Sequence, residues 1–370
     1  MAIAPSDRQY EPAGRPTELT DISYLLLQGS HDADVSSCLG LRQFQRVSFS
    51  GPGPWFKSLL YVGRANHGQF NTVWGRTDLP APVSHLLNLR PLLDGEDQRQ
   101  IAKTFIPAFL DLTLRRNETY RPMFRDYRQA AAWLPDTTYI SQYRDPGFRT
   151  IADFEEDIDL TSTSLAGGTI EARGLTTWRQ EDLKLRGGGT QRNQVTRLGW
   201  GEEQEEGELG ESAESDPNTS ATQAEPPEFE IKLPDTGTAL DISAAAALVF
   251  DLLDASEEPN ADVPLDLTVE LVDGAGTSVA LPLSHFQPVP GPIETEFTKW
   301  PALERLAPQY DSPVDFILQT FALPLEQFTA VNELFDPSRL STIRLRFDRQ
   351  PGGAIVLDGI GIDVCKRFAN

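Results

Sequence analysis

Two polar turns carry residue types that could do acid–base chemistry, and each turn follows an apolar run. Residues 25–27 lead into a turn that holds Asp32, and residues 59–62 lead into a turn that holds His67. A carboxylate beside an imidazole fixes the tautomer of the ring and stabilises the imidazolium that forms when the ring accepts a proton. The two residues are therefore candidates for an acid and a general base that act together.

The segments around these turns predict the end of a doubly wound α/β domain. Residues 21–28 and 57–62 are short, apolar and bounded by turn residues, which predicts two buried strands. Residues 97–116 carry apolar side chains at helical spacing and end on arginines, which predicts a closing helix. Because the separation of 35 positions suits one crossover and one strand, we expect Asp32 and His67 at neighbouring strand ends.

The motifs Gly29-x-x-Asp32-x-x-Val35 and Asn66-His67-Gly68 resemble the α/β-hydrolase family, in its bacterial esterase, lipase and dienelactone-hydrolase-like branch. In that family the first motif follows the seventh strand and the second follows the eighth. The resemblance implies that Asp32 is the triad acid, that His67 is the triad base and that the substrate is an ester. It covers residues 21–116, the last strands and helix of such a domain.

The departure from the family pattern concerns the nucleophile. The chain contains no G-x-S-x-G, and only about twenty residues precede the first predicted strand, where the family has six further strands. We expect a truncated or split serine hydrolase that lacks its attacking serine and is inactive alone. Its partners would be an ester substrate or a missing N-terminal catalytic half.

Other interpretations of the same residues stay open. Asp32 is alternatively a turn carboxylate, and His67 alternatively a histidine hydrogen-bonded within its turn. Asp34 competes with Asp32 as the acid, and with His31 it otherwise serves the turn. The remaining histidines, His85 and His285, have no visible partners in the sequence. Three polar residues would line the pocket mouth or serve simply as loop polarity: Asn66, Gln69 and Asn71.

From residue 136 onward, short β-rich runs separated by turn residues predict an all-β jelly roll or sandwich. The predicted strands are 138–143, 169–171, 175–178, 229–233, 247–252, 265–273, 277–283, 316–321, 341–348 and 354–362. Residues 325–334 predict a short helix. The expected organisation is a flexible tail over 1–20, the α/β part over 21–132 and the sandwich over 136–370. The acidic segment 201–228 is expected to be a disordered loop.

The segments 151–157 and 355–362 resemble the first and last strands of galactose-binding-like jelly rolls, a fold of many carbohydrate-binding modules. If these strands pair, Glu155 approaches Asp358, and the resemblance implies a structural calcium there. The alternative is that both are solvated strand-end charges, and no other cofactor is expected. A non-catalytic module that binds a glycan or a protein is the alternative function. Three tryptophans would form a sugar platform or pack inside: Trp178, Trp200 and Trp300.

Composition sets the remaining limits. The net charge of −23 argues against a nucleic-acid partner, because backbone binding needs Lys and Arg. No apolar run approaches the ~20 residues of a membrane span. No signal peptide is visible, so the location is cytoplasmic by default although relatives are exported. Cys38 and Cys365 are expected as free thiols or as one long-range disulfide.

Overall fold

The computed structural model describes most of the chain. The described residues are 1–7, 11, 14–201, 225–234, 240, 242, 246–256, 263–304, 308–310 and 312–364. Most of the acidic segment 201–228 and Cys365 therefore lie outside them, and Cys38 is a buried free thiol. No helix among these residues is long and apolar enough to cross a membrane.

A mixed sheet in the order β1-β3-β5-β6 carries both polar turns. The predicted strands are confirmed as β3 (Tyr24–Gly29) and β5 (Lys57–Val62), which pair in parallel from Tyr24–Lys57 to Gly29–Val62. The short β1 (Ala2–Ile3) lies parallel to the other side of β3, within the segment expected to be a tail. A separate parallel pair is formed by β2 (Leu19–Thr20) and β4 (Val47–Ser48).

One strand lies in a different layer from the one expected. The sequence predicts a strand of the sandwich at 138–143, but β6 (Tyr139–Arg144) pairs antiparallel with β5. Sequence texture could not reveal this, because an antiparallel strand looks the same at the edge of either sheet.

Helices cover both faces of the mixed sheet. The predicted closing helix is α2 (Gly95–Arg115), which begins at Asp94, whose side chain accepts from the Glu96 amide. Its apolar face packs on Leu25, Leu27 and Leu60, whereas α1 (Gly40–Gln45) packs on Leu26 and Leu59 from the opposite face. The other described α-helices are α3 (Arg121–Arg125), α4 (Pro301–Glu304) and α5 (Leu325–Val331). The last of these lies where a short helix was predicted.

Antiparallel strands form the two layers of a β-sandwich around one large apolar core. The sheet nearer the α/β part has the order β15-β12-β17-β10-β9, with β7 also paired to β17. Its strands are β15 (Gln319–Pro324), β12 (Ala247–Asp254), β17 (Gly353–Asp363), β10 (Thr190–Trp200), β9 (Thr177–Lys184) and β7 (Phe148–Ala152). The second sheet contains β14 (Ser278–Pro282), β13 (Thr268–Asp273), β16 (Leu340–Arg346), β11 (Glu228–Lys232) and β8 (Thr169–Arg173).

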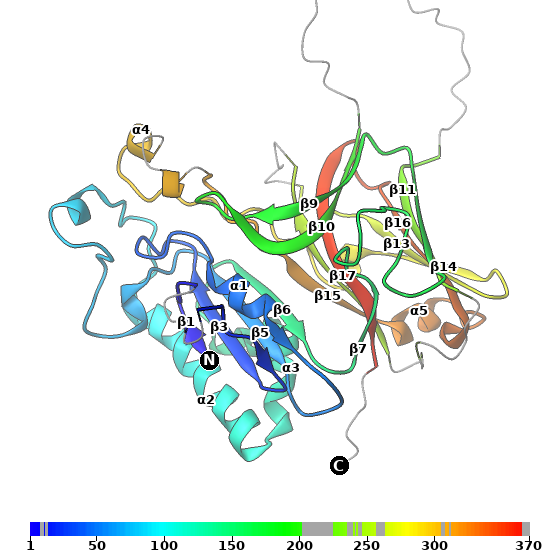
Figure 1. The fold of residues 1–370 in the computed structure, drawn as a ribbon, viewed down its shortest axis with the longest axis horizontal. Coiled ribbons are helices and arrows are strands. Elements are labelled where there is room, and N and C mark those ends of the chain that lie inside the picture. The colour runs from blue at the N-terminus through cyan, green and yellow to red at the C-terminus, as the bar shows by residue number, and fades with distance from the viewer. Residues whose placement is uncertain are drawn as a thin grey trace, which may run out of the picture.

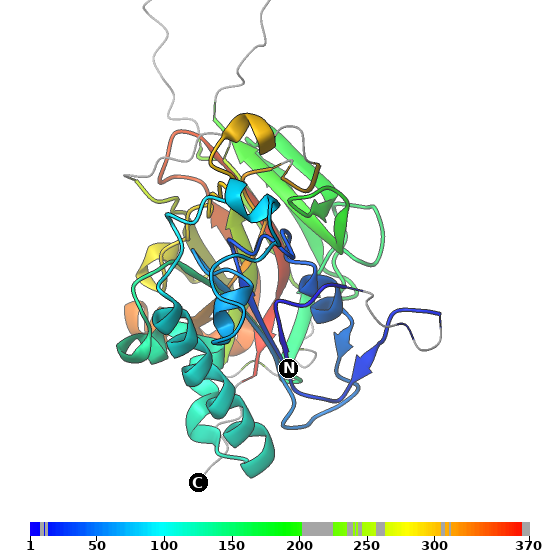
Figure 2. The same cartoon turned by 90° about the vertical axis from the view of Figure 1, so that its left-hand side faces the viewer.

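The α/β part and the sandwich lie side by side (Figure 1), and the view turned by 90° shows α2 on the outer side of the mixed sheet (Figure 2). Polar groups join them along the free edge of β6. The amide of Ser141 donates to Gln319 Oε1 at 2.9 Å, and Gln142 Nε2 donates to the Leu318 carbonyl at 3.0 Å. The sandwich therefore satisfies backbone groups that the edge strand would otherwise leave unpaired.

Candidate functional site

The turns after β3 and β5 bring the predicted acid and base together. His67 Nδ1 lies 2.9 Å from Asp32 Oδ2, a hydrogen-bond distance. The contact arises because the carboxyl ends of two adjacent parallel strands meet at one edge of the sheet. The juxtaposition expected from the sequence is thus present.

Asp32 is held rigidly at the bottom of its turn. The side chain is 1% exposed, and its Oδ1 accepts from the amides of Asp34 at 3.1 Å and Val35 at 2.7 Å. Its Oδ2 accepts from Gln28 Nε2 as well as from His67. Burial raises the pKa of Asp32, and the hydrogen bond to His67 opposes this rise. These hydrogen bonds orient the carboxylate toward Nδ1.

His67 presents its second nitrogen away from this carboxylate. The hydrogen bond to Asp32 raises the pKa of His67, with burial opposing it. Nε2 lies 3.8 Å from Asp34 Oδ2, so Asp34 neighbours the other nitrogen and does not replace Asp32 at Nδ1. The Trp74 ring stacks on the imidazole at 5.5 Å between centroids. Within the described part of the chain, no hydroxyl or thiol hydrogen-bonds to Nε2.

Asp78 connects the two turns, and sequence reasoning missed it. One oxygen accepts from the Ala33 amide in the first turn and from the His67 amide in the second, both at 3.0 Å. The other accepts from the Gly68 amide at 2.9 Å and from Asn66 Nδ2 at 2.7 Å. Burial raises the pKa of Asp78, and these amide donors oppose the rise. No local pattern marks Asp78, because its partners lie in turns that only the folded sheet brings together.

The other polar residues near the turns have structural roles. Asn66 and Gln69, two of the expected pocket-mouth residues, are 1% and 3% exposed and bond to neighbouring loop groups. Asn66 lines a small cavity together with His31 and Asp78, and Gln69 donates to the Leu93 carbonyl. Asn71 caps the amides of Val73 and Trp74.

The remaining histidines lie outside the pair. His31 is buried and hydrogen-bonds to Ser30 Oγ at 2.9 Å, and burial lowers the pKa of His31 to about 4. His85 and His285 are exposed, and His285 Nε2 contacts Gln327 Oε1.

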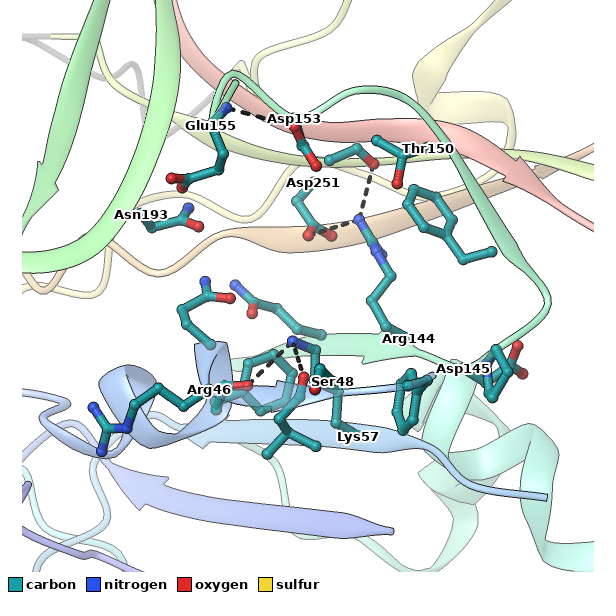
Figure 3. A pocket seen from close by; sticks show the side chains of 18 of the residues that line it. Arg46, Ser48, Lys57, Arg144, Asp145, Thr150, Asp153, Glu155, Asn193 and Asp251 are labelled. Carbon is teal, nitrogen blue, oxygen red and sulfur yellow. Dashed lines mark hydrogen bonds and ion pairs between the residues drawn. The ribbon is translucent and has the colours of Figure 1, made fainter. Parts of the chain in front are cut away.

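A separate polar cavity of about 770 Å³ lies between the α/β part and the sandwich. Figure 3 shows Lys57 and Arg144 from the α/β part facing Asn193 and Asp251 from the sandwich. Arg144 Nη2 donates to Asp251 Oδ2 at 2.8 Å, and Asn193 Nδ2 donates to Asp358 Oδ2 at 2.7 Å. Burial, with the nearby Asp251 charge, raises the pKa of Asp358 to about 7.

The expected calcium ligands lie on this cavity. β7 pairs antiparallel with β17, as predicted for the terminal strands, and both Glu155 and Asp358 line the cavity wall. Glu155 Oε1 accepts from the Gln194 amide, and Asp358 accepts from Asn193, so each carboxylate has a protein partner. Among the described residues no cluster of three or more His, Cys, Asp or Glu side chains could hold a metal ion.

The tryptophans do not form a common platform. Trp200 is 4% exposed and stacks on Phe347, and Trp178 packs edge-on against Phe229. Trp300 is 54% exposed, next to α4. The interpretation that two of them pack inside is thus the one that the structure supports.

Comparisons with known proteins found several solved structures at low identity and no family. No family model and no curated protein matches the chain. A family 30 carbohydrate-binding module of a Clostridium thermocellum cellulosomal cellulase is 13% identical, with 53% of this chain and 90% of that chain covered and a TM-score of 0.30.

Two further solved structures match this chain at comparably low identity and TM-score. A family 11 module from the same organism, in complex with a β-1,3-1,4-mixed-linked tetrasaccharide, is 9% identical, with 58% and 95% covered and a TM-score of 0.31. An exo-β-agarase is 10% identical, with 58% and 25% covered and a TM-score of 0.30. At these values the matches assign neither a family nor a ligand to the chain.

Proposed function

We propose that Asp32 and His67 are the acid and the general base of a serine-hydrolase-type site that acts on carboxylic esters. The observation that carries the proposal is the 2.9 Å contact between His67 Nδ1 and the buried Asp32 carboxylate at the ends of two parallel strands. A second polypeptide segment supplies the nucleophilic hydroxyl in this proposal, because the described residues place none at Nε2.

The geometry suits both halves of an acyl transfer. Nε2 accepts the hydroxyl proton as the oxygen bonds to the ester carbonyl carbon, and it later gives this proton to the leaving alcohol. Asp32 stays ionised and stabilises the imidazolium between these steps. Water then reverses the sequence and releases the acid from the acylated hydroxyl.

The proposal can be tested on this chain with an activated ester, because an oriented imidazole is itself nucleophilic. Slow hydrolysis of p-nitrophenyl acetate should depend on His67 and fall several-fold toward background in His67→Gln. His285→Gln removes an exposed histidine elsewhere and should leave the rate unchanged. Equal rates for the wild type and His67→Gln would contradict the proposal.

A glycan is the second candidate ligand, and the interdomain cavity is the observation that favours it. Its wall combines amides and charged groups, such as Gln142 and Asn193, with the ring of Phe148. Such a mixture of hydrogen-bonding groups and an aromatic ring is suited to a polyhydroxylated ligand. In this proposal the sandwich binds a saccharide through the cavity without acting on it.

Calorimetry with mixed-linked β-glucan and with agarose oligosaccharides tests the binding proposal. Asn193→Leu should abolish any heat of binding, whereas Trp300→Ala, outside the cavity, should not change it. Absence of binding to every oligosaccharide, or binding that survives Asn193→Leu, would contradict a glycan site in this cavity.

A further inference from the structure

Arg186 is a fully buried cation at the point where the sandwich meets the Asp32 turn. It follows β9, at the tip of the β9–β10 hairpin that reaches over the α/β part (Figure 1), and it is 1% exposed. Its Nη1 donates to the carbonyls of Ser30 and Ser36, both at 3.1 Å. These two carbonyls flank the turn that presents Asp32.

Other groups of the same part reinforce this contact. The Gly187 amide donates to Ser37 Oγ at 2.9 Å, and Thr295 Oγ1 donates to the Ser30 carbonyl at 3.3 Å. Groups of the sandwich therefore hydrogen-bond to both ends of the turn. Asp78 instead accepts from the Ala33 amide in the turn and from the His67 amide.

The guanidinium of Arg186 is ion-paired but not fully hydrogen-bonded. Asp315 Oδ2 lies 3.8 Å from Nη2, and the Phe297 ring lies 4.9 Å from the guanidinium carbon. Both Nε and Nη2 are buried without a hydrogen-bond partner. Because burying a cation with incomplete pairing costs free energy, a packed apolar side chain would serve stability at least as well. A role in fixing the turn accounts for a guanidinium at this position.

We propose that Arg186 is a positioning residue for the Asp32–His67 pair, through which the β-sandwich holds the acid-bearing turn in its hydrogen-bonding geometry. The proposal rests on the proposed function of that pair. It makes the sandwich a structural component of the acid–base site, distinct from any ligand bound in the cavity.

The test compares the pKa of His67, measured by histidine NMR titration, in variants of the full chain. Arg186→Met should lower the His67 pKa by about half a unit or more, because a loosened carboxylate stabilises the imidazolium less well. Arg186→Lys should restore part of this shift, since an ammonium can still donate to both carbonyls. Arg192→Met, an exposed arginine of the same hairpin, should leave the pKa unchanged.

Two further variants keep the proposal testable if Arg186→Met does not fold. Thr295→Val removes one contact to the turn and should shift the His67 pKa in the same direction by less, even if Arg186→Met does not fold. Asp32→Asn defines the full effect of the acid. An unchanged His67 pKa in folded Arg186→Met, or in Thr295→Val where Arg186→Met does not fold, with a clear shift in Asp32→Asn, would overturn the role of Arg186 alone. No shift in Asp32→Asn would overturn the proposed pair itself.

Discussion

At the scale of residues, two carboxylates hold the Asp32–His67 pair in place. Asp32 contacts the imidazole directly, and Asp78 holds the amides of Ala33 and His67, which belong to the two turns. Asp32 is buried and Asp78 is half-buried, so each needs its donors to offset the loss of solvation. The distance between ring and acid therefore depends on a residue that touches neither side chain through a hydrogen bond.

Replacing Asp78 by asparagine should weaken this arrangement. Both oxygens of Asp78 accept from N–H groups, so the NH₂ group of an asparagine would face donors in place of one oxygen. We expect the free energy of unfolding to fall by about 1–3 kcal/mol. The His67 pKa should fall as well, since the negative charge of Asp78, which raises it, is removed. Urea unfolding and NMR titration measure the two effects. Asp97→Asn, at an exposed position of α2, is the matched control and should change neither.

Asp358 should make stability depend on pH near neutrality. Its folded pKa of about 7 lies above the unfolded value of 3.8, so the folded state binds the proton more tightly. The stability that proton binding to Asp358 adds to the folded state is present at low pH and is lost as the pH rises through 7. Asp358→Asn should therefore raise the melting temperature relative to wild type more at pH 8.5 than at pH 5. A difference that is constant between these pH values would show that the carboxyl is not buried as described.

At the scale of elements, the sequence predicts the strands and helices that local patterns encode. It does not predict which strands pair with one another. β3, β5 and α2 were recognisable from apolar runs and helical spacing, and this placed Asp32 and His67 correctly. β10 was missed, because Thr190–Trp200 carries polar residues such as Arg192 and Asn193 on its cavity side. The partner sheet of β6, the role of Asp78 and the contact of Arg186 depend on tertiary neighbours that no single sequence window contains.

The seam between β6 and β15 gives an element-scale prediction. Gln319→Leu removes the acceptor of the buried Ser141 amide and should lower the free energy of unfolding by about 1–3 kcal/mol. Gln327→Leu, which alters the exposed contact to His285, is the control and should cost little. Chemical denaturation monitored by circular dichroism measures both. Equal small effects would mean that water satisfies the Ser141 amide.

At the scale of the whole molecule, side-chain contacts and a common cavity join the sandwich to the α/β part. The hairpin at Arg186 contacts the Asp32 turn, and the cavity is lined from both sides. Because no described residue places a hydroxyl at Nε2, we expect that a fluorophosphonate does not label a serine of the isolated chain. Intact-mass spectrometry checks this, and a single adduct on a serine would show that the chain carries its own nucleophile.

The most direct measurement is the NMR titration of His67 in the wild type and in Asp32→Asn. We predict an Nδ1-protonated ring whose pKa lies above the ordinary histidine value in the wild type and falls by about a unit or more in the variant. The same pKa in both proteins, or a ring that carries its neutral-state proton on Nε2, would contradict an acid–base pair at these strand ends.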